Sequence, residues 1–432
     1  MLRKNIKGLT ALLTVLLLLM PVCAFAAVAN VKPPVTAAET KEKWVLSLGT
    51  DYKNAPSIPA LYGDYLYVMS GKKIYKINKS SGETVKTGDM SGRPTYAYIP
   101  VTVAQGKVFC PIGDGVIEAF DADTLTKLWS VADPLGGQAM TPIAFENGKI
   151  FTGFWNSDTD DANFDCIDAS SGKILWSLKR KGGYYWSECA FYGNYAIIGG
   201  EDGVDAQNGD NYVYSVRISD GSVAGSLNIQ GDMRSGITNV GNTLYMVTKA
   251  AKLYKTSIDS SGNFGTLYST NLAGYSTSTP TLYGGKIYIG MAGGGKNEGY
   301  VGIFDASSLT STAQVKVQGF PQSEILVASG YDSPVAYTTY NNGPGGVVAI
   351  TQSGTSYSAE EIYTPSSGHT GYCISTVVAD TDGSLYYKND SGTIFALTSN
   401  NSQDNSGEGI SGFINLLISF FRMIISFILS LF

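Results

Sequence analysis

The sequence predicts an all-β protein, an eight-bladed β-propeller whose blades each contain four antiparallel strands. A hydrophobic–aromatic–hydrophobic triplet recurs along the chain at steps of 42 to 49 residues, and a glycine-containing turn precedes most copies. The triplets are centred on Tyr67, Phe109, Phe151, Ile197, Tyr245, Tyr288, Tyr337 and Tyr386, and only the fourth lacks its aromatic ring. Alternating apolar residues between closely spaced turns indicate antiparallel strands, and four strands at this period indicate propeller blades.

The composition argues against nucleic-acid-binding proteins and against proteins with multi-histidine metal sites. The 432 residues include 30 Lys+Arg and 36 Asp+Glu, a net charge of -6, with charged residues at only 15% against about 25% in typical proteins. The chain has no long basic tract, so we expect no nucleic-acid partner. With one histidine, His369, a multi-histidine metal site is not expected.

The N-terminus has the layout of a cleaved signal peptide over residues 1–26. Arg3, Lys4 and Lys7 precede an apolar run, and small residues follow at 24–29. We expect cleavage after Ala26, with Ala29 as the alternative, and therefore an exported protein. Residues 27–42 are expected to be a linker.

Four cysteines remain after this cleavage: Cys110, Cys166, Cys189 and Cys373. They are scattered singly, so zinc and redox motifs are not indicated. We expect buried free thiols on strands. A Cys166–Cys189 disulfide is the one alternative that export would permit.

The propeller is expected to fill residues 43–399. Each triplet strand is followed by a glycine-rich turn, a third strand, a polar turn and a fourth strand, as in 73–77 and 173–176. The last blade ends near Leu397 with only three strands. An orphan strand at 43–48 is expected to be its fourth, closing the ring with hydrogen bonds instead of an open edge. Two unrelated β domains are the alternative.

Residues 120–129 and 167–176 share a pattern in which an apolar strand and an aspartate lead through a polar turn to a tryptophan. This pattern resembles the repeat of quinoprotein-type propellers, which are named for pyrroloquinoline quinone (PQQ). The resemblance implies that a tryptophan after the turn packs between neighbouring blades, a docking role that falls here to Trp44, Trp129 and Trp176. The family includes dehydrogenases that bind PQQ with Ca²⁺ and also scaffolds without a cofactor.

The residues favour the scaffold branch of that family. Its dehydrogenases bind the quinone between adjacent cysteines and a tryptophan that stacks beneath it, but this chain has no Cys-Cys pair. Of its five tryptophans, three are expected to pack between blades, so only Trp155 and Trp186 could take the stacking role. We therefore expect no PQQ and assign no catalytic residue. A Gly-x-Ser-x-Gly nucleophile motif is also absent from the sequence.

One face of the ring is expected to carry a ligand site, because the loops between second and third strands and those between blades emerge on the same side. The candidate binding residues there are Tyr96, Tyr98, Trp155, Tyr184, Tyr185, Trp186, Arg234, Tyr275, His369 and Tyr372. Aromatic planes beside hydrogen-bonding groups suit a protein, peptide or glycan ligand. The alternative is that the rings simply pack between blades.

A calcium site is a weaker candidate on the same face. Asn156, Asp158 and Asp160 alternate as Ca²⁺ ligands do, but the loop lacks glycine at the sixth position and glutamate at the twelfth. A solvated acidic loop is the alternative.

The C-terminus predicts membrane association. A polar linker, 400–409, leads to an apolar segment, 410–432, that would be about 34 Å long as a helix. Phe413, Leu417, Phe421 and Ile425 are apolar residues of this helix, and Arg422 is its one charged residue. A spanning helix, an interfacial helix and a self-associating helix remain alternatives.

Together these patterns predict an exported, envelope-associated propeller that acts as a non-enzymatic binding or scaffolding module. The alternative is a PQQ- or Ca²⁺-dependent oxidoreductase.

Overall fold

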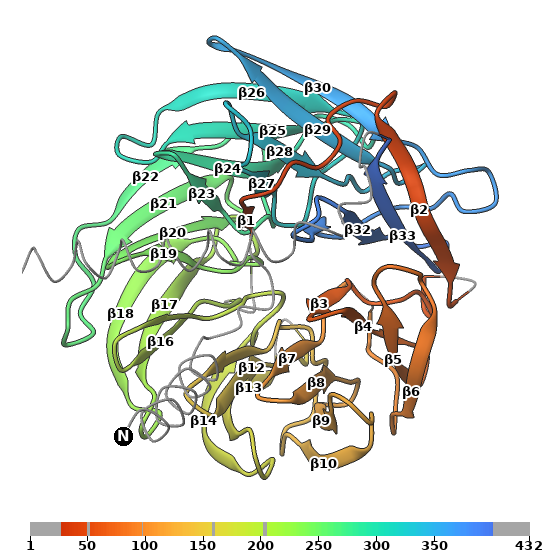
Figure 1. The fold of residues 1–432 in the computed structure, drawn as a ribbon. Helices are drawn as coiled ribbons and strands as arrows, with labels where there is room; N and C mark the ends of the chain where they lie inside the picture. The colour runs from red at the N-terminus through yellow and green to blue at the C-terminus, as the bar shows by residue number, and fades with distance from the viewer. Residues whose placement is uncertain (1–26, 50–51, 97, 158–159, 202–204, 401–432) are drawn as a thin grey trace, which may run out of the picture.

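The computed structural model describes residues 27–49, 52–96, 98–157, 160–201 and 205–400. Its strands form eight sheets arranged as a ring around a central axis (Figure 1), which confirms the eight-bladed propeller. Within these ranges, no helix is long and apolar enough to cross a membrane. The expected signal peptide and C-terminal helix lie outside the described residues.

Each of the first four blades is a four-stranded antiparallel sheet whose strands follow in chain order. Blade 1 contains β3 (Ala60–Tyr62), β4 (Tyr65–Ser70), β5 (Lys73–Asn78) and β6 (Thr84–Asp89). Blade 2 contains β7 (Thr102–Ala104), β8 (Lys107–Pro111), β9 (Val116–Asp121) and β10 (Lys127–Ala132). Blade 3 contains β11 (Ala144–Glu146), β12 (Lys149–Gly153), β13 (Asp161–Asp168) and β14 (Ile174–Lys181). Blade 4 contains β15 (Ala190–Tyr192), β16 (Tyr195–Ile198), β17 (Asp210–Arg217) and β18 (Val223–Gln230).

The second half of the ring repeats this order and ends with a composite blade. Blade 5 contains β19 (Thr238–Val240), β20 (Thr243–Thr248), β21 (Lys252–Ser257) and β22 (Tyr268–Asn271). Blade 6 contains β23 (Thr281–Tyr283), β24 (Lys286–Ala292), β25 (Gly299–Asp305) and β26 (Ser311–Val317). Blade 7 contains β27 (Leu326–Ala328), β28 (Val335–Thr338), β29 (Val347–Ser353) and β30 (Ser356–Tyr363), and blade 8 contains β31 (Val378–Ala379), β32 (Leu385–Lys388), β33 (Thr393–Ser399) and β2 (Thr40–Ser47).

The recurring triplets all lie on the second strands of the blades, where their side chains are buried. Eight apolar clusters fill the spaces between the sheets, with Tyr67, Phe109 and Tyr337 among the fully buried rings. The blades are therefore held to one another mainly by side-chain burial, which is the main stabilising contribution in most folds.

The ring closes as predicted. β2 pairs antiparallel with β33, with Trp44 opposite Ala396, so the N-terminal strand completes the last blade. In Figure 1 the segment between β1 and β2 runs from the centre of the ring to its rim. The expected linker is thus largely ordered, and it contributes the short strand β1 (Val28–Ala29), which adds in parallel to β27.

At three of the junctions between blades, a tryptophan packs one blade against the next. The indole nitrogen of Trp44 donates to the Lys79 carbonyl at 2.9 Å, and Trp129 and Trp176 make the equivalent bonds to Ala169 and Ile218 at 3.2 and 3.0 Å. Each ring lies over the glycine of the next blade's turn, namely Gly82, Gly172 and Gly221. These glycines have positive φ, and a Cβ there would approach within 3 Å of the indole ring.

All four cysteines of the described residues are buried and free, so the Cys166–Cys189 disulfide is not formed.

Candidate functional site

Five aromatic rings form a continuous chain on the loop-rich face. Tyr96 stacks on Tyr98 at 5.8 Å, Tyr98 meets Trp186 edge-on at 6.1 Å, Trp186 packs on Tyr185 at 5.0 Å, and Tyr185 meets Trp155 at 5.6 Å. The rings come from the connection into β7, the β12–β13 loop and the connection into β15. Three separate loops therefore bring five of the predicted residues together.

An ionic group stands beside one end of this aromatic chain. The Glu201 carboxylate is buried, accepts a hydrogen bond from the Trp155 indole nitrogen at 2.8 Å and pairs with Arg234 at 2.5 Å. The guanidinium of Arg234 lies over the Tyr185 ring, 4.5 Å from its centroid. Glu201 thus orients both the outermost ring and the cation.

The environment of Glu201 sets its charge. Burial raises the pKa of this carboxyl to about 7, although the nearby Arg234 lowers it and Asp232 raises it. The group therefore titrates near neutral pH, so the charge of the Glu201–Arg234 pair depends on pH in that range.

Trp186 is held in an unusual conformation. Its φ of 59° is in the left-handed region, which bulky residues rarely adopt. Its indole nitrogen is buried and has no hydrogen-bond partner among the described residues. Both features cost free energy, and such costs concentrate at functional sites.

A cavity of about 90 Å³ lies on the axis of the ring, with room for several water molecules. Tyr98 and Trp186 line it, together with the carboxyl groups of Glu188 and Glu324. Burial raises the pKa of Glu188 to about 7 and that of Glu324 to about 8, the latter helped by the charge of Glu188. The aromatic chain thus borders an acidic channel.

A second hollow, of about 410 Å³, contains two other predicted residues, Tyr275 and Tyr372. Tyr275 packs edge-on against Phe320 at 5.1 Å and lies under the Lys249 ammonium at 4.7 Å. Tyr372 is 57% exposed. These two rings supply a second patch on the loop-rich face, outside the five-ring chain.

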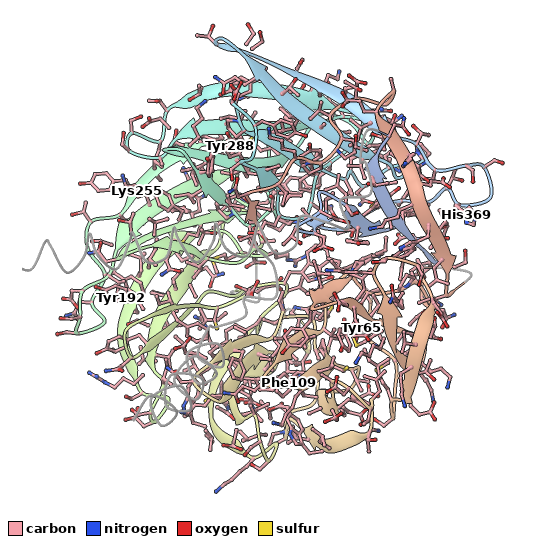
Figure 2. All side chains as sticks on the ribbon, viewed as in Figure 1. Tyr65, Phe109, Tyr192, Lys255, Tyr288 and His369 are labelled. Carbon is pink, nitrogen blue, oxygen red and sulfur yellow. The ribbon has the colours of Figure 1, made fainter. Side chains whose placement is uncertain are left out.

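Two predicted residues lie elsewhere. Tyr184 is fully buried in the core and donates its hydroxyl hydrogen to the Leu178 carbonyl, so its ring does not face solvent. Figure 2 shows His369 at the outer edge of the ring, away from the axis. Its Nδ1 lies 3.2 Å from the Thr393 hydroxyl, and its ring packs against Phe395.

The loop proposed to bind Ca²⁺ is partly outside the described residues, because Asp158 is not among them. The Asn156 amide donates to the carbonyls of Leu135 and Asp161, and Asp160 accepts from Ser157. Where the chain is described, no group of three or more His, Cys, Asp or Glu residues is arranged to hold a metal ion.

The fold and its repeat are similar to those of PQQ-like β-propellers. Residues 35–144 match the sequence model of the family described as outer membrane protein assembly factor BamB. No curated protein matches the chain.

Solved structures share the fold at low sequence identity. BamB from Moraxella catarrhalis is 12% identical with a TM-score of 0.57, and the match covers 85% of this chain and 99% of that one. The quinohemoprotein alcohol dehydrogenase ADHIIG from Pseudomonas putida HK5 is 13% identical with a TM-score of 0.64, covering 87% and 79%. The computationally designed protein Ika8 is 13% identical with a TM-score of 0.59, covering 82% and 98%. At these identities the matches show the fold alone.

The residues present do not fit a quinone held as the resemblance implies. Of the four cysteines in the described ranges, no two are adjacent, and all are buried. The axial cavity is lined by Glu188 and Glu324, and none of its lining residues is a cysteine. We therefore derive no step through this cofactor.

Proposed function

We propose that the protein is an exported, envelope-associated scaffold without enzymatic activity, and that it binds an extended segment of a protein partner. The observation that carries this proposal is the five-ring chain from Tyr96 to Trp155, which ends at the Arg234–Glu201 pair. Rigid aromatic rings beside an arginine are the residues that dominate binding energy at protein interfaces. The match of residues 35–144 to the BamB family supports the same class of function.

The site can bind a peptide segment through hydrogen bonds as well as through its rings. The unpaired indole N–H of Trp186 can only donate, so it requires an acceptor such as a peptide carbonyl. Arg234 pairs with Glu201 through its Nε, and its terminal amino groups can donate to carbonyl or carboxylate oxygens of the partner. A segment lying across the rings would make both contacts at once.

Binding to a peptide array and to a glycan array tests this proposal. The mature protein should retain peptides that combine an acidic residue with an aromatic or aliphatic one. The double variant Tyr185→Ala/Trp186→Ala should lose that binding while its stability falls by no more than about 3 kcal/mol, the usual range for single substitutions. Tyr268→Ala, which removes a 59%-exposed ring on β22, is the control and should bind normally. Retention of glycans alone, or of nothing, would contradict the proposal.

The oxidoreductase alternative has a direct test. An absorbance spectrum and a metal analysis of the purified protein should reveal no stoichiometric quinone and no stoichiometric Ca²⁺. Finding both would replace the scaffold proposal with that of a quinoprotein enzyme.

The envelope association depends on residues 410–432. We expect removal of this segment to release the protein from the membrane fraction while the propeller stays folded, because an exposed apolar helix requires lipid or another copy of itself. Changing Ile418, Phe421 and Ile425 to Asp should have the same effect. If the full-length mature protein fractionates as a soluble monomer, the anchoring role is wrong.

A further inference from the structure

Strand β1 lies inside the ring. It pairs in parallel with β27, the first strand of blade 7, with Val28 opposite Val327 and Ala29 opposite Ala328. The Val327 amide donates to the Ala27 carbonyl at 2.7 Å, and Figure 1 shows β1 at the centre of the ring. The two strands run in the same direction, so the residue before Val28, Ala27, lies beside Leu326. The backbone nitrogen of Ala27 therefore points toward Ile325 and Glu324, which precede Leu326.

Glu324 is one of two carboxyl groups in the axial cavity, and neither has a cationic partner in the described part of the chain. Glu188 comes from the connection into β15 and Glu324 from the connection into β27. The charge of Glu188 raises the pKa of Glu324, and no lysine or arginine offsets it. Lys388, whose ammonium lies 4.8 Å from the centroid of the neighbouring Tyr98 ring, is already paired with Asp390 at 3.3 Å.

We propose that signal cleavage after Ala26 supplies the missing cation, and that the new α-amine of Ala27 pairs with Glu324 and Glu188 inside the channel. The cleavage is a hydrolysis by a signal peptidase. Water breaks the Ala26–Ala27 peptide bond, leaving a carboxylate on the released peptide and an ammonium group on Ala27. This proposal rests on export, which is part of the proposed function.

The register supports the pairing. Ala27 lies level with Leu326, and two strand residues span about 7 Å, so the Glu324 side chain can reach the amine directly or through one water. An α-amine has a usual pKa of about 7.7 to 8.0 and is largely charged at neutral pH. It would thus neutralise a half-buried carboxylate that has no other cationic partner among the described residues.

The register also selects between the two cleavage sites. Cleavage after Ala26 leaves the whole of β1 in the mature chain, whereas cleavage after Ala29 removes both of its residues. Val28 packs into the apolar cluster shared by blades 6 and 7, so its loss would expose that cluster. The presence of β1 in the fold therefore favours the earlier site.

The first experiment identifies the N-terminus of the exported protein by N-terminal sequencing and intact mass. We expect Ala27 as the first residue, and Asn30 would overturn the assignment of the cleavage site. The second experiment does not depend on export. The protein is made behind a cleavable fusion whose protease leaves Ala27 first. Its α-amine is then reductively dimethylated with ¹³C-formaldehyde and cyanoborohydride as the hydride donor, which keeps the amine titratable.

Titration of the ¹³C signal then tests the pairing. In the folded protein the pKa of the amine should lie about one pH unit above its value in the urea-unfolded chain, which is a tenfold stronger affinity for the proton. Glu324→Gln should remove most of this difference, whereas Glu298→Gln, at an exposed ion pair with Lys316, should leave it intact. If Glu324→Gln does not fold, Glu188→Gln makes the same comparison. An amine pKa that is equal in the folded and unfolded chains would overturn the pairing, even if sequencing finds Ala27.

Discussion

The indole ring of Trp186 meets the ring of Tyr98 edge-on, with the centroids 6.1 Å apart and the planes at 88°. The contact joins the connection into blade 2 with the connection into blade 4, and both rings line the axial cavity. It therefore links the aromatic chain on the loop face to the channel that Glu188 and Glu324 occupy.

Replacing Trp186 by glycine and by alanine distinguishes the contribution of its ring to binding from the cost of its backbone conformation to stability. Both variants lack the ring, so both should lose binding of the peptide probe at least tenfold. The free energy of unfolding of Trp186→Gly should be about 1 kcal/mol larger than that of Trp186→Ala, because glycine adopts positive φ without the steric cost of a Cβ. Urea unfolding measures the difference. Equal stability of the two variants would show that the backbone relaxes and that position 186 holds no strain.

The fold was largely predictable from the sequence because its signals are local. The second strands carry the recurring triplets, and the orphan strand at 43–48 stood out because the last blade lacked a partner for β33. β1 was not predictable, since its two small apolar residues, Val28 and Ala29, have no local strand pattern. Their pairing with Val327 and Ala328 spans about 300 residues, and nothing near either segment indicates it.

The candidate site was predictable only in part. Aromatic residues in loops of one face indicated the five-ring chain, but Tyr184, Tyr185 and Trp186 are adjacent, and sequence alone does not tell which ring turns inward. Tyr184 does, and it fills the core. Glu188 and Glu324 are single acidic residues in separate connections, so only the closed ring places both in one channel.

Deleting residues 40–47 should remove the strand that completes blade 8. β33 would then lose its antiparallel partner and present an unpaired edge, which promotes aggregation. We expect loss of a single cooperative unfolding transition, measured by circular dichroism, and aggregation in light scattering. A deletion variant that melts like the parent would show that the ring closes without β2.

The packing of Trp129 on Gly172 gives a prediction with a matched control. Gly172 and Gly148 both have positive φ, 73° and 76°, but a Cβ on Gly172 would lie 2.7 Å from the Trp129 ring, whereas a Cβ on Gly148 would meet nothing within 4 Å. Gly148→Ala should cost about 1 to 2 kcal/mol of unfolding free energy from the backbone alone. Gly172→Ala should cost about 1 to 3 kcal/mol more, because the indole must move. Equal losses in urea unfolding would show that the tryptophan is not held against the turn.

Two aspartates on β13 should differ in how they affect the dependence of stability on pH. Burial raises the pKa of the Asp165 carboxyl, with Ser177 lowering it and the neighbouring Asp133 raising it. The folded protein therefore binds a proton at Asp165 that the unfolded chain has released. The stability from this group is present below the unfolded pKa of 3.8 and is lost as pH rises through the higher folded pKa. Asp165→Asn should therefore be increasingly stabilising, relative to the parent, as pH rises from 4 toward 8.

Asp168, three residues further along the strand, is the control for this prediction. Hydrogen bonds from the hydroxyl groups and amides of Ser170 and Ser171 lower its pKa to about 2. Its contribution is present above the unfolded pKa of 3.8 and is lost as pH falls through about 2, so Asp168→Asn should destabilise the protein by a constant amount from pH 5 to 8. Urea unfolding of the parent and both variants at pH 5, 6, 7 and 8 measures the two differences. Parallel curves for Asp165→Asn and the parent would mean that Asp165 stays ionised in the folded protein, and the burial argument for this carboxyl would fail.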